Sequence, residues 1–162
     1  MFSLVSTIMI MRRLLLALAL VGLTGCDLST DVADQPTDPA NETFAAGLQV
    51  NIASMTKTQA GDYYRDVKVG DGPEIAGIPS IVISYQAYLK DGTLVAVVNS
   101  GTVVLGSMIP GLRDAMQGMR PGGERLIVVP SAMAYGNATT VTGIPPNSTL
   151  VFDLLFKAYP LQ

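Results

Sequence analysis

The chain has 162 residues, a formal net charge of −3, one cysteine, and no histidine or tryptophan. The absence of histidine excludes His-based nucleophile triads, His general bases and most zinc or iron sites. A single cysteine excludes an intramolecular disulfide, so any chemistry must use carboxylates, lysine, tyrosine, hydroxyl groups, the backbone or an apolar surface.

Residues 1–25 have the pattern of a signal peptide. Arg12 and Arg13 precede a Leu/Ala run over residues 14–21, and Leu-Thr-Gly-Cys follows at 23–26. The apolar run is shorter than the roughly 20 residues of a membrane span, and this order of regions is typical of a secretory signal. The Leu-x-Gly-Cys ending resembles the bacterial lipobox, which implies that Cys26 is the first mature residue and carries a lipid. The alternative is an ordinary signal peptide with an incidental cysteine.

Residues 26–49 are predicted to be the lipidated cysteine and a flexible acidic tether. All charged side chains in this segment are acidic, and it contains Pro36, Pro39 and few large apolar residues before Phe44. Such a composition cannot bury enough apolar surface to offset the entropy of ordering. The folded domain is therefore placed at residues 50–162, where eight basic and eight acidic residues balance. No basic patch is present there, which argues against nucleic-acid binding.

The domain is predicted to be rich in strands. Alternate residues between Ile81 and Leu89 are apolar and would share one face of a half-buried strand. Asp91-Gly92 indicates a turn into a partner strand at 94–98. Further strands are expected at 102–105, 124–129 and 149–159, with 63–69 as a candidate edge strand.

One segment has helical spacing instead. Leu112, Ala115, Met116 and Met119 recur on one side of a helix that Pro110-Gly111 precedes and Pro121-Gly122-Gly123 ends. The methionines are more typical of a core than of a ligand site. The predicted class is α+β, with an antiparallel sheet that curls around this short helix.

Four motifs occur in an order that resembles FKBP-type peptidyl-prolyl isomerases. They are Leu-Gly-Ser-Met-Ile-Pro-Gly-Leu at 105–112, Met-Arg-Pro-Gly-Gly-Glu-Arg at 119–125, Val-Pro-Ser-Ala-Met-Ala-Tyr-Gly at 129–136, and Gly-Ile-Pro-Pro-Asn-Ser-Thr-Leu-Val-Phe-Asp at 143–153. The resemblance extends from about Tyr63 to the C-terminus. It implies a five- to six-stranded antiparallel β-sheet wrapped around one short α-helix, and cis–trans isomerisation of X–Pro bonds without a metal or an organic cofactor.

The resemblance also implies the roles of individual residues. Tyr85, Ile109 and Tyr135 match the catalytic positions, with the Ile109 backbone N–H offered to the substrate carbonyl and the Tyr135 hydroxyl donating to the ligand. The matching substrate-binding positions are Met108, Leu112, Ile144 and Phe152. Three positions depart from the family pattern: Val95 and Ala96 replace Phe-Asp, and Gly101 replaces an aromatic residue.

Two functions remain open at this point. The first is an active isomerase that acts on proline-containing polypeptides of the bacterial cell envelope, anchored by the lipid on Cys26 and facing the periplasm or exterior. The second is a peptide-binding or chaperone module with the same fold and weak or no isomerase activity, which the three departures favour. In either case we expect a monomer.

Overall fold

The computed structural model describes residues 36–138 and 141–161. The predicted signal peptide, Cys26 and the first part of the predicted tether lie outside the described residues. Within the described part of the chain, no helix is both long and apolar enough to cross a membrane.

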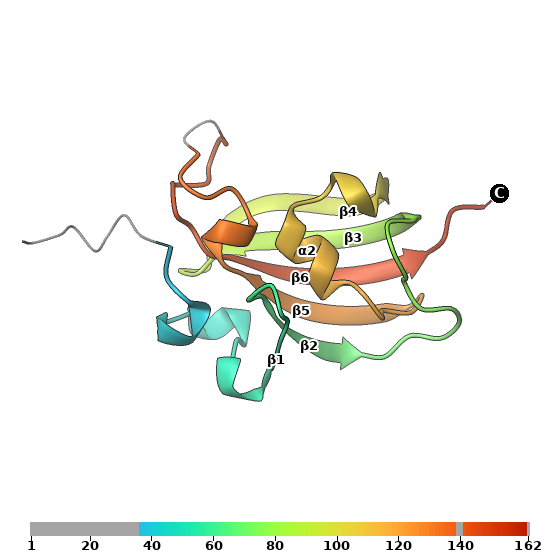
Figure 1. Cartoon of the computed structure of the whole chain (residues 1–162), viewed down its shortest axis with the longest axis horizontal. Helices are drawn as coiled ribbons and strands as arrows, with labels where there is room; N and C mark the ends of the chain where they lie inside the picture. The colour runs from blue at the N-terminus through green and yellow to red at the C-terminus, as the bar shows by residue number, and fades with distance from the viewer. Residues whose placement is uncertain (1–35, 139–140, 162) are drawn as a thin grey trace, which may run out of the picture. The chain divides into compact units, whose positions relative to one another are not determined.

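The described residues form a six-stranded antiparallel sheet and one short α-helix, α2 (Figure 1). The strand order is β1-β2-β5-β6-β3-β4, and the strands are β1 (Thr56–Lys57), β2 (Tyr63–Lys68), β3 (Ser80–Leu89), β4 (Leu94–Val104), β5 (Gly123–Val129) and β6 (Leu150–Ala158). This architecture confirms the predicted fold class. The candidate edge strand at 63–69 is instead second from the edge, because the short β1 pairs outside β2.

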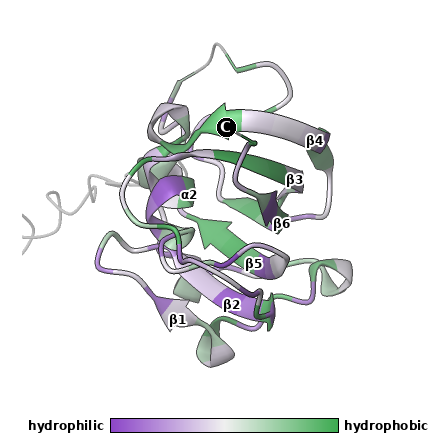
Figure 2. Ribbon diagram, turned by 90° about the vertical axis from the view of Figure 1, so that its right-hand side faces the viewer, coloured by the Kyte–Doolittle hydropathy of each residue, from purple (hydrophilic) through white to green (hydrophobic). Residues whose placement is uncertain are grey.

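The two faces of the sheet are covered by different parts of the chain. Alternate side chains point to opposite faces of a strand, so Ile81 and Ile83 of β3 lie with Leu154 and Phe156 of β6 in the core beneath α2. We call this side the helix face and the opposite side the outer face. Figure 2 shows strongly apolar residues in β3 and β5, whereas β2 is mainly hydrophilic.

Helix α2 (Pro110–Ala115) is shorter than the predicted helical segment. Leu112, Ala115, Met116 and Met119 are all buried, as predicted, but Met116 lies in the turn that follows the helix and Met119 lies just beyond that turn. Gly118 has a positive φ of 75° and donates its N–H to the Ile75 carbonyl, which ends the helix early. The carbonyl groups that remain at this end are partly satisfied by a buried side chain: Arg125 Nη1 donates to Ala115 O at 2.6 Å and to Gln117 O at 3.1 Å.

The prediction of separate strands at 94–98 and 102–105 is wrong. These segments form one strand, β4, which pairs with β3 along its whole length. The register of this pairing shifts twice, once between Ile83 and Tyr85 of β3 and once between Ala87 and Tyr88. A β-bulge accommodates an extra residue without ending a ladder, so Asn99 and Ser100 continue the strand. Leu105 belongs to the 3-10 turn Leu105–Ser107 that follows it.

Residues 38–49 were predicted to belong to the tether, but they pack on the outer face of the sheet. Phe44 and Leu48 contact a second apolar cluster whose buried strand residues are Tyr63, Leu126, Val128 and Val151. Asp38 accepts hydrogen bonds from Lys57 Nζ at 2.7 Å and from the Tyr63 hydroxyl at 2.9 Å. Side-chain anchors at both ends thus hold a segment that composition alone suggested would be flexible.

Candidate functional site

Two aromatic side chains form the centre of the candidate site on the helix face. Tyr85 lies on β3 and Phe152 on the neighbouring β6, two register positions apart since Ala87 pairs with Phe152 and Tyr85 with Leu154. Their ring centroids are 5.7 Å apart with an interplanar angle of 65°, an edge-to-face contact. Such contacts stabilise aromatic pairs beyond the burial of their area. Phe152 is buried in the core, whereas Tyr85 is only half-buried and therefore remains accessible from solvent.

Tyr135 approaches this pair from the loop that follows β5. The 3-10 turn Ser131–Met133 and the positive φ of Gly136, 57°, reverse the chain around it, and the Gly136 N–H donates to Ser131 O. The side chain of Tyr135 is 40% exposed. The pKa of the Tyr85 hydroxyl is raised, first by burial and then by the neighbouring Tyr135. The two phenols therefore lie near one another, and the raised pKa keeps the Tyr85 hydroxyl a neutral donor at neutral pH.

Ile144 lies in a second loop, which is bonded to the first. The Asn147 N–H donates to Gly136 O at 2.7 Å, and Ser148 Oγ donates to Pro145 O at 2.7 Å. Gly143 has a φ of 81°, a conformation that glycine adopts readily because it has no Cβ. This turn brings the half-buried Ile144 into contact with the helix-face core.

The remaining site residues come from the entry into α2. Met108 and Ile109 are half-buried and pack against the core, and Leu112 in the first turn of the helix is buried. Ile109 precedes the helix with extended geometry, φ −55° and ψ 144°, and its carbonyl accepts the Arg113 N–H. Within the described residues, the Ile109 N–H donates no hydrogen bond. It is a backbone donor among apolar side chains.

We call Tyr85, Met108, Ile109, Leu112, Tyr135, Ile144 and Phe152 the site cluster. All except Tyr135 belong to the helix-face core or pack against it, and Tyr135 joins through Tyr85. The structure therefore brings the predicted residues onto one face from four separate segments of the chain.

The three departures lie on β4, at the side of the same face. Val95 and Ala96 are half-buried against the core, and Ala96 lies opposite Ala87 of β3. Gly101 pairs with Ile83, and a Cβ at Gly101 would lie 3.2 Å from Val98 Cγ1. A larger residue at 101 would therefore require Val98 to shift.

Sequence reasoning missed one buried polar group below α2. The Asp62 side chain is buried, with Oδ2 accepting from Thr58 Oγ1 at 3.1 Å and Oδ1 without a partner in the described residues. Burial raises the pKa of this carboxyl above its ordinary value. A Cβ at Gly111 would lie 2.3 Å from Asp62 Oδ1, so only glycine fits there. No local pattern around Asp62 marks it as buried, because the contact joins residues far apart in the sequence.

The sequence model described as FKBP-type peptidyl-prolyl cis-trans isomerase matches residues 72–157. The chain is 32% identical to the chloroplastic peptidyl-prolyl cis-trans isomerase FKBP16-4 of Arabidopsis thaliana over 156 residues, covering 88% of this chain and 66% of that protein. It is 36% identical to the FKBP-type isomerase FkpA of Escherichia coli K12 over 119 residues, covering 70% of this chain and 41% of FkpA. The crystal structure of FkpA from Escherichia coli superposes with a TM-score of 0.60 at 31% identity, covering 65% of this chain and 53% of that one.

These matches, with the sheet and helix described above, show that the chain belongs to the FKBP-type peptidyl-prolyl cis-trans isomerase family. The chain spans about two fifths to two thirds of the length of these curated relatives.

Proposed function

We propose that this protein catalyses the cis–trans isomerisation of X–Pro bonds in exported polypeptides, with the site cluster as its active site. The observation that carries the proposal is the convergence of Tyr85, Tyr135 and Phe152 with the unbonded Ile109 N–H on one apolar face. Membership of the isomerase family supports the same assignment.

The chemistry of the reaction suits such a surface. Rotation about the imide bond has a barrier of roughly 18–20 kcal/mol because the planar form is stabilised by resonance. The twisted transition state loses this resonance and is less polar than the planar ground state. A site with apolar walls therefore binds the transition state better than the ground state, which is the condition for acceleration. No nucleophile, metal or proton relay is needed, in keeping with the lack of histidine.

Each group in the cluster then has a separate role. Phe152, Leu112 and Ile144 provide apolar contacts to the proline ring, and Met108 extends that wall. The Ile109 N–H donates to a carbonyl oxygen of the substrate and orients the peptide. The raised pKa keeps the Tyr85 hydroxyl protonated near neutral pH, and the hydroxyls of Tyr85 and Tyr135 act as further donors. Each tenfold acceleration requires about 1.4 kcal/mol, an amount that one or two hydrogen bonds together with desolvation can supply.

The decisive experiment removes only the backbone donor. Ile109 has a φ of −55° and Met108 has φ −83° and ψ 164°, so proline fits at 109 without changing the backbone. In a protease-coupled peptide assay on the full chain, we expect Ile109→Pro to lower kcat/KM about tenfold. Ile109→Ala removes the side chain but keeps the donor, and it should cost less. Equal activity of the two variants would show that the Ile109 N–H does not contribute to catalysis.

The second candidate function is peptide binding or chaperoning with weak or no isomerase activity. It is favoured by Val95, Ala96 and Gly101, because aliphatic residues and glycine occupy the β4 side of the site where the family pattern has two aromatic rings and a carboxylate. Lack of acceleration by the wild-type chain at micromolar concentration would favour this candidate. If the departures limit the rate, Val95→Phe combined with Ala96→Asp should raise kcat/KM.

We propose further that the protein is exported and anchored through a lipid on Cys26, facing the periplasm or exterior. The support is the lipobox-like sequence at 23–26 and the basic and apolar regions before it. Radiolabelled palmitate should be incorporated by the wild-type chain in a bacterial host. Incorporation should be lost in Cys26→Ser, and equal labelling of both chains would refute the anchor.

A further inference from the structure

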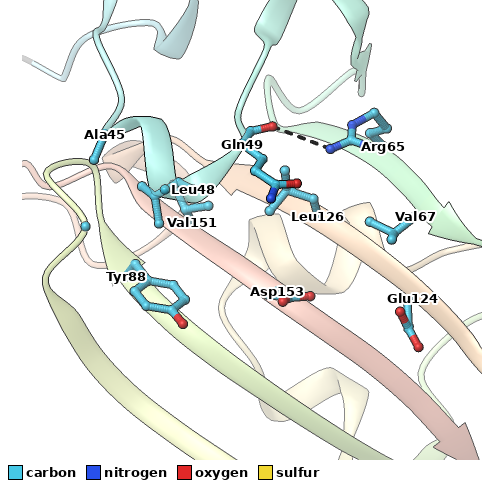
Figure 3. A pocket seen from close by; sticks show the side chains of 12 residues that line it. Ala45, Leu48, Gln49, Arg65, Val67, Tyr88, Glu124, Leu126, Val151 and Asp153 are labelled. Carbon is cyan, nitrogen blue, oxygen red and sulfur yellow. Dashed lines mark hydrogen bonds between the residues drawn. The ribbon is translucent and has the colours of Figure 1, made fainter.

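A hollow of about 420 Å³ lies on the outer face of the sheet, away from the site cluster (Figure 3). Its volume is within the range of ligand sites, roughly 300–1,000 Å³. Its walls come from two parts of the chain, the segment around Ala45–Gln49 and the strands β2, β3, β5 and β6. The N-terminal segment that packs on the sheet is therefore part of this hollow, and a fragment that began at residue 50 would lack that wall.

The strand register explains why the hollow is apolar at one end and charged at the other. On the outer face, Val128 of β5 pairs with Val151 of β6, and Leu48 of the N-terminal segment packs over them. One position further along the same face, Leu126 pairs with Asp153. The next position carries Glu124. The N-terminal segment covers only the apolar end, so these carboxylates lie at the uncovered end.

The two carboxylates also lie between two hollows. A second hollow of about 240 Å³ is lined by Glu124 and Asp153 on one side and by Gln86 and Leu155 among its other residues. Because both hollows share these two side chains, the concave surface continues across β6 toward β3. A surface that continues over two adjoining hollows suits an extended segment of polypeptide better than a compact small molecule.

Within the described residues, the side chains of Glu124 and Asp153 make no hydrogen bond and no ion pair, although Lys68 of β2 is the register partner of Glu124. Arg65 is the one cationic side chain in the lining, and its guanidinium points toward the Gln49 carbonyl at 3.5 Å rather than toward either carboxylate. Figure 3 shows Asp153 and Glu124 projecting from adjacent strands, with Arg65 turned away to Gln49. The hollow thus has an apolar floor beside two carboxylates, Asp153 and Glu124, that can pair with a cationic group.

We propose that this outer hollow binds a lysine or arginine side chain of an extended, basic polypeptide segment. The aliphatic stem of such a side chain would lie on Leu126 and Val151, and its charged head would reach Asp153 and Glu124, since long basic side chains combine an apolar stem with a polar tip. Arg65 and Gln49 supply donors for carbonyl groups of the bound backbone. The 420 Å³ hollow shares no lining residue with the site cluster, whereas Tyr85 lines the second hollow, and the proposed binding requires no proline.

The test uses the full chain and fluorescently labelled peptides without proline. The basic probe is acetyl-Leu-Lys-Val-Lys-Leu-amide, the acidic one has glutamate in place of both lysines, and binding is followed by anisotropy at low and high salt. We expect the basic peptide to bind more tightly, and Asp153→Asn to weaken it about three- to tenfold at low salt. Asp71→Asn is the matched control, because it removes an exposed carboxylate that lines neither hollow. It should leave binding unchanged.

A steric variant provides a second arm. Gly47 lines the hollow, and a Cβ there would meet no atom within 4 Å, so Gly47→Phe should obstruct the basic peptide without straining the fold. Equal binding of the acidic and basic peptides would overturn the proposal, as would equal effects of Asp153→Asn and Asp71→Asn. Isomerase activity should persist in Asp153→Asn, so failure of this proposal is distinguishable from failure of the proposed isomerase function.

Discussion

The two faces of the sheet differ in how completely they are closed, although the same strands form both. On β6, Phe152, Leu154 and Phe156 point into a continuous core beneath α2, whereas Asp153 between them points to the outer face. Among the described residues, the outer face has apolar cover only where residues 44–55 pack. The helix face therefore accounts for the fold and the proposed catalysis. The outer face is free to carry charged groups that folding does not require.

The largest expected effect is on the free energy of unfolding, when a leucine is truncated to alanine on each face of the sheet. Leu154 is fully buried in the helix-face core, while Leu48 is 9% exposed in the smaller outer cluster. We expect Leu154→Ala to lower the free energy of unfolding by about 4 kcal/mol and Leu48→Ala by about 2 kcal/mol, since the cost of a cavity grows with the completeness of packing. Urea denaturation measures both. A larger loss for Leu48→Ala would reverse the ranking of the two faces.

A smaller effect on stability is expected from Asp62, the buried carboxyl beneath α2. Burial raises the pKa of Asp62 above its ordinary value of 3.8, so its cost to stability appears as the pH rises through 3.8 and grows until the pH passes the raised pKa. Asp62→Asn should therefore stabilise the protein by about 1–3 kcal/mol at pH 7. The gain should vanish well below pH 3.8, where the acid is protonated in both the folded and the unfolded state. Thermal unfolding across this range checks the sign, and a pH-independent change would contradict it.

Two tyrosines of β3 that lie on opposite faces of the sheet allow the effect of each face on isomerase activity to be compared. Tyr85 lies in the site cluster, whereas Tyr88 points to the outer face and donates its hydroxyl to Gln86 Oε1. Tyr85→Phe keeps the ring but removes a donor, and we expect kcat/KM to fall about fivefold, equivalent to roughly 1 kcal/mol. Tyr88→Phe should leave kcat/KM unchanged. A similar fall in both variants would mean that stability, not position, determines the rate.

The smallest expected effect is at the anchor of the N-terminal segment. The hydrogen bonds from Lys57, the Ala40 N–H and Tyr63 lower the pKa of Asp38 to about 2. Its contribution is therefore present above pH 4 and is lost as the pH falls from 3.8 toward 2. Asp38→Asn should cause only the small, salt-sensitive loss typical of surface ion pairs. Differential scanning calorimetry at two salt concentrations measures it, and a large loss independent of salt would point to a different role.

Local sequence patterns were sufficient to predict the structure where the pattern lies within one strand, turn or helix. The alternation in β3 and the helical spacing of Leu112 and Ala115 predicted the observed burial, and the Asp91-Gly92 turn predicted the pairing of β3 with β4. They were insufficient where distant residues decide the outcome. The bulges that join the two halves of β4 depend on pairing with β3, and the ordering of residues 38–49 depends on strand residues such as Val128 and Val151.

The sequence by itself determined the α+β class and the family, because periodicity and motif order are local properties of the chain, and the resemblance to that family supplied the residues proposed for the site. Tertiary structure decided which groups meet: Asp62 with Gly111, Tyr85 with Tyr135, and the N-terminal segment with the outer face. The outer hollow is likewise a feature that only the tertiary structure decided. Asp153 follows Phe152 in the sequence, and the pleat of β6 sends the two side chains to opposite faces.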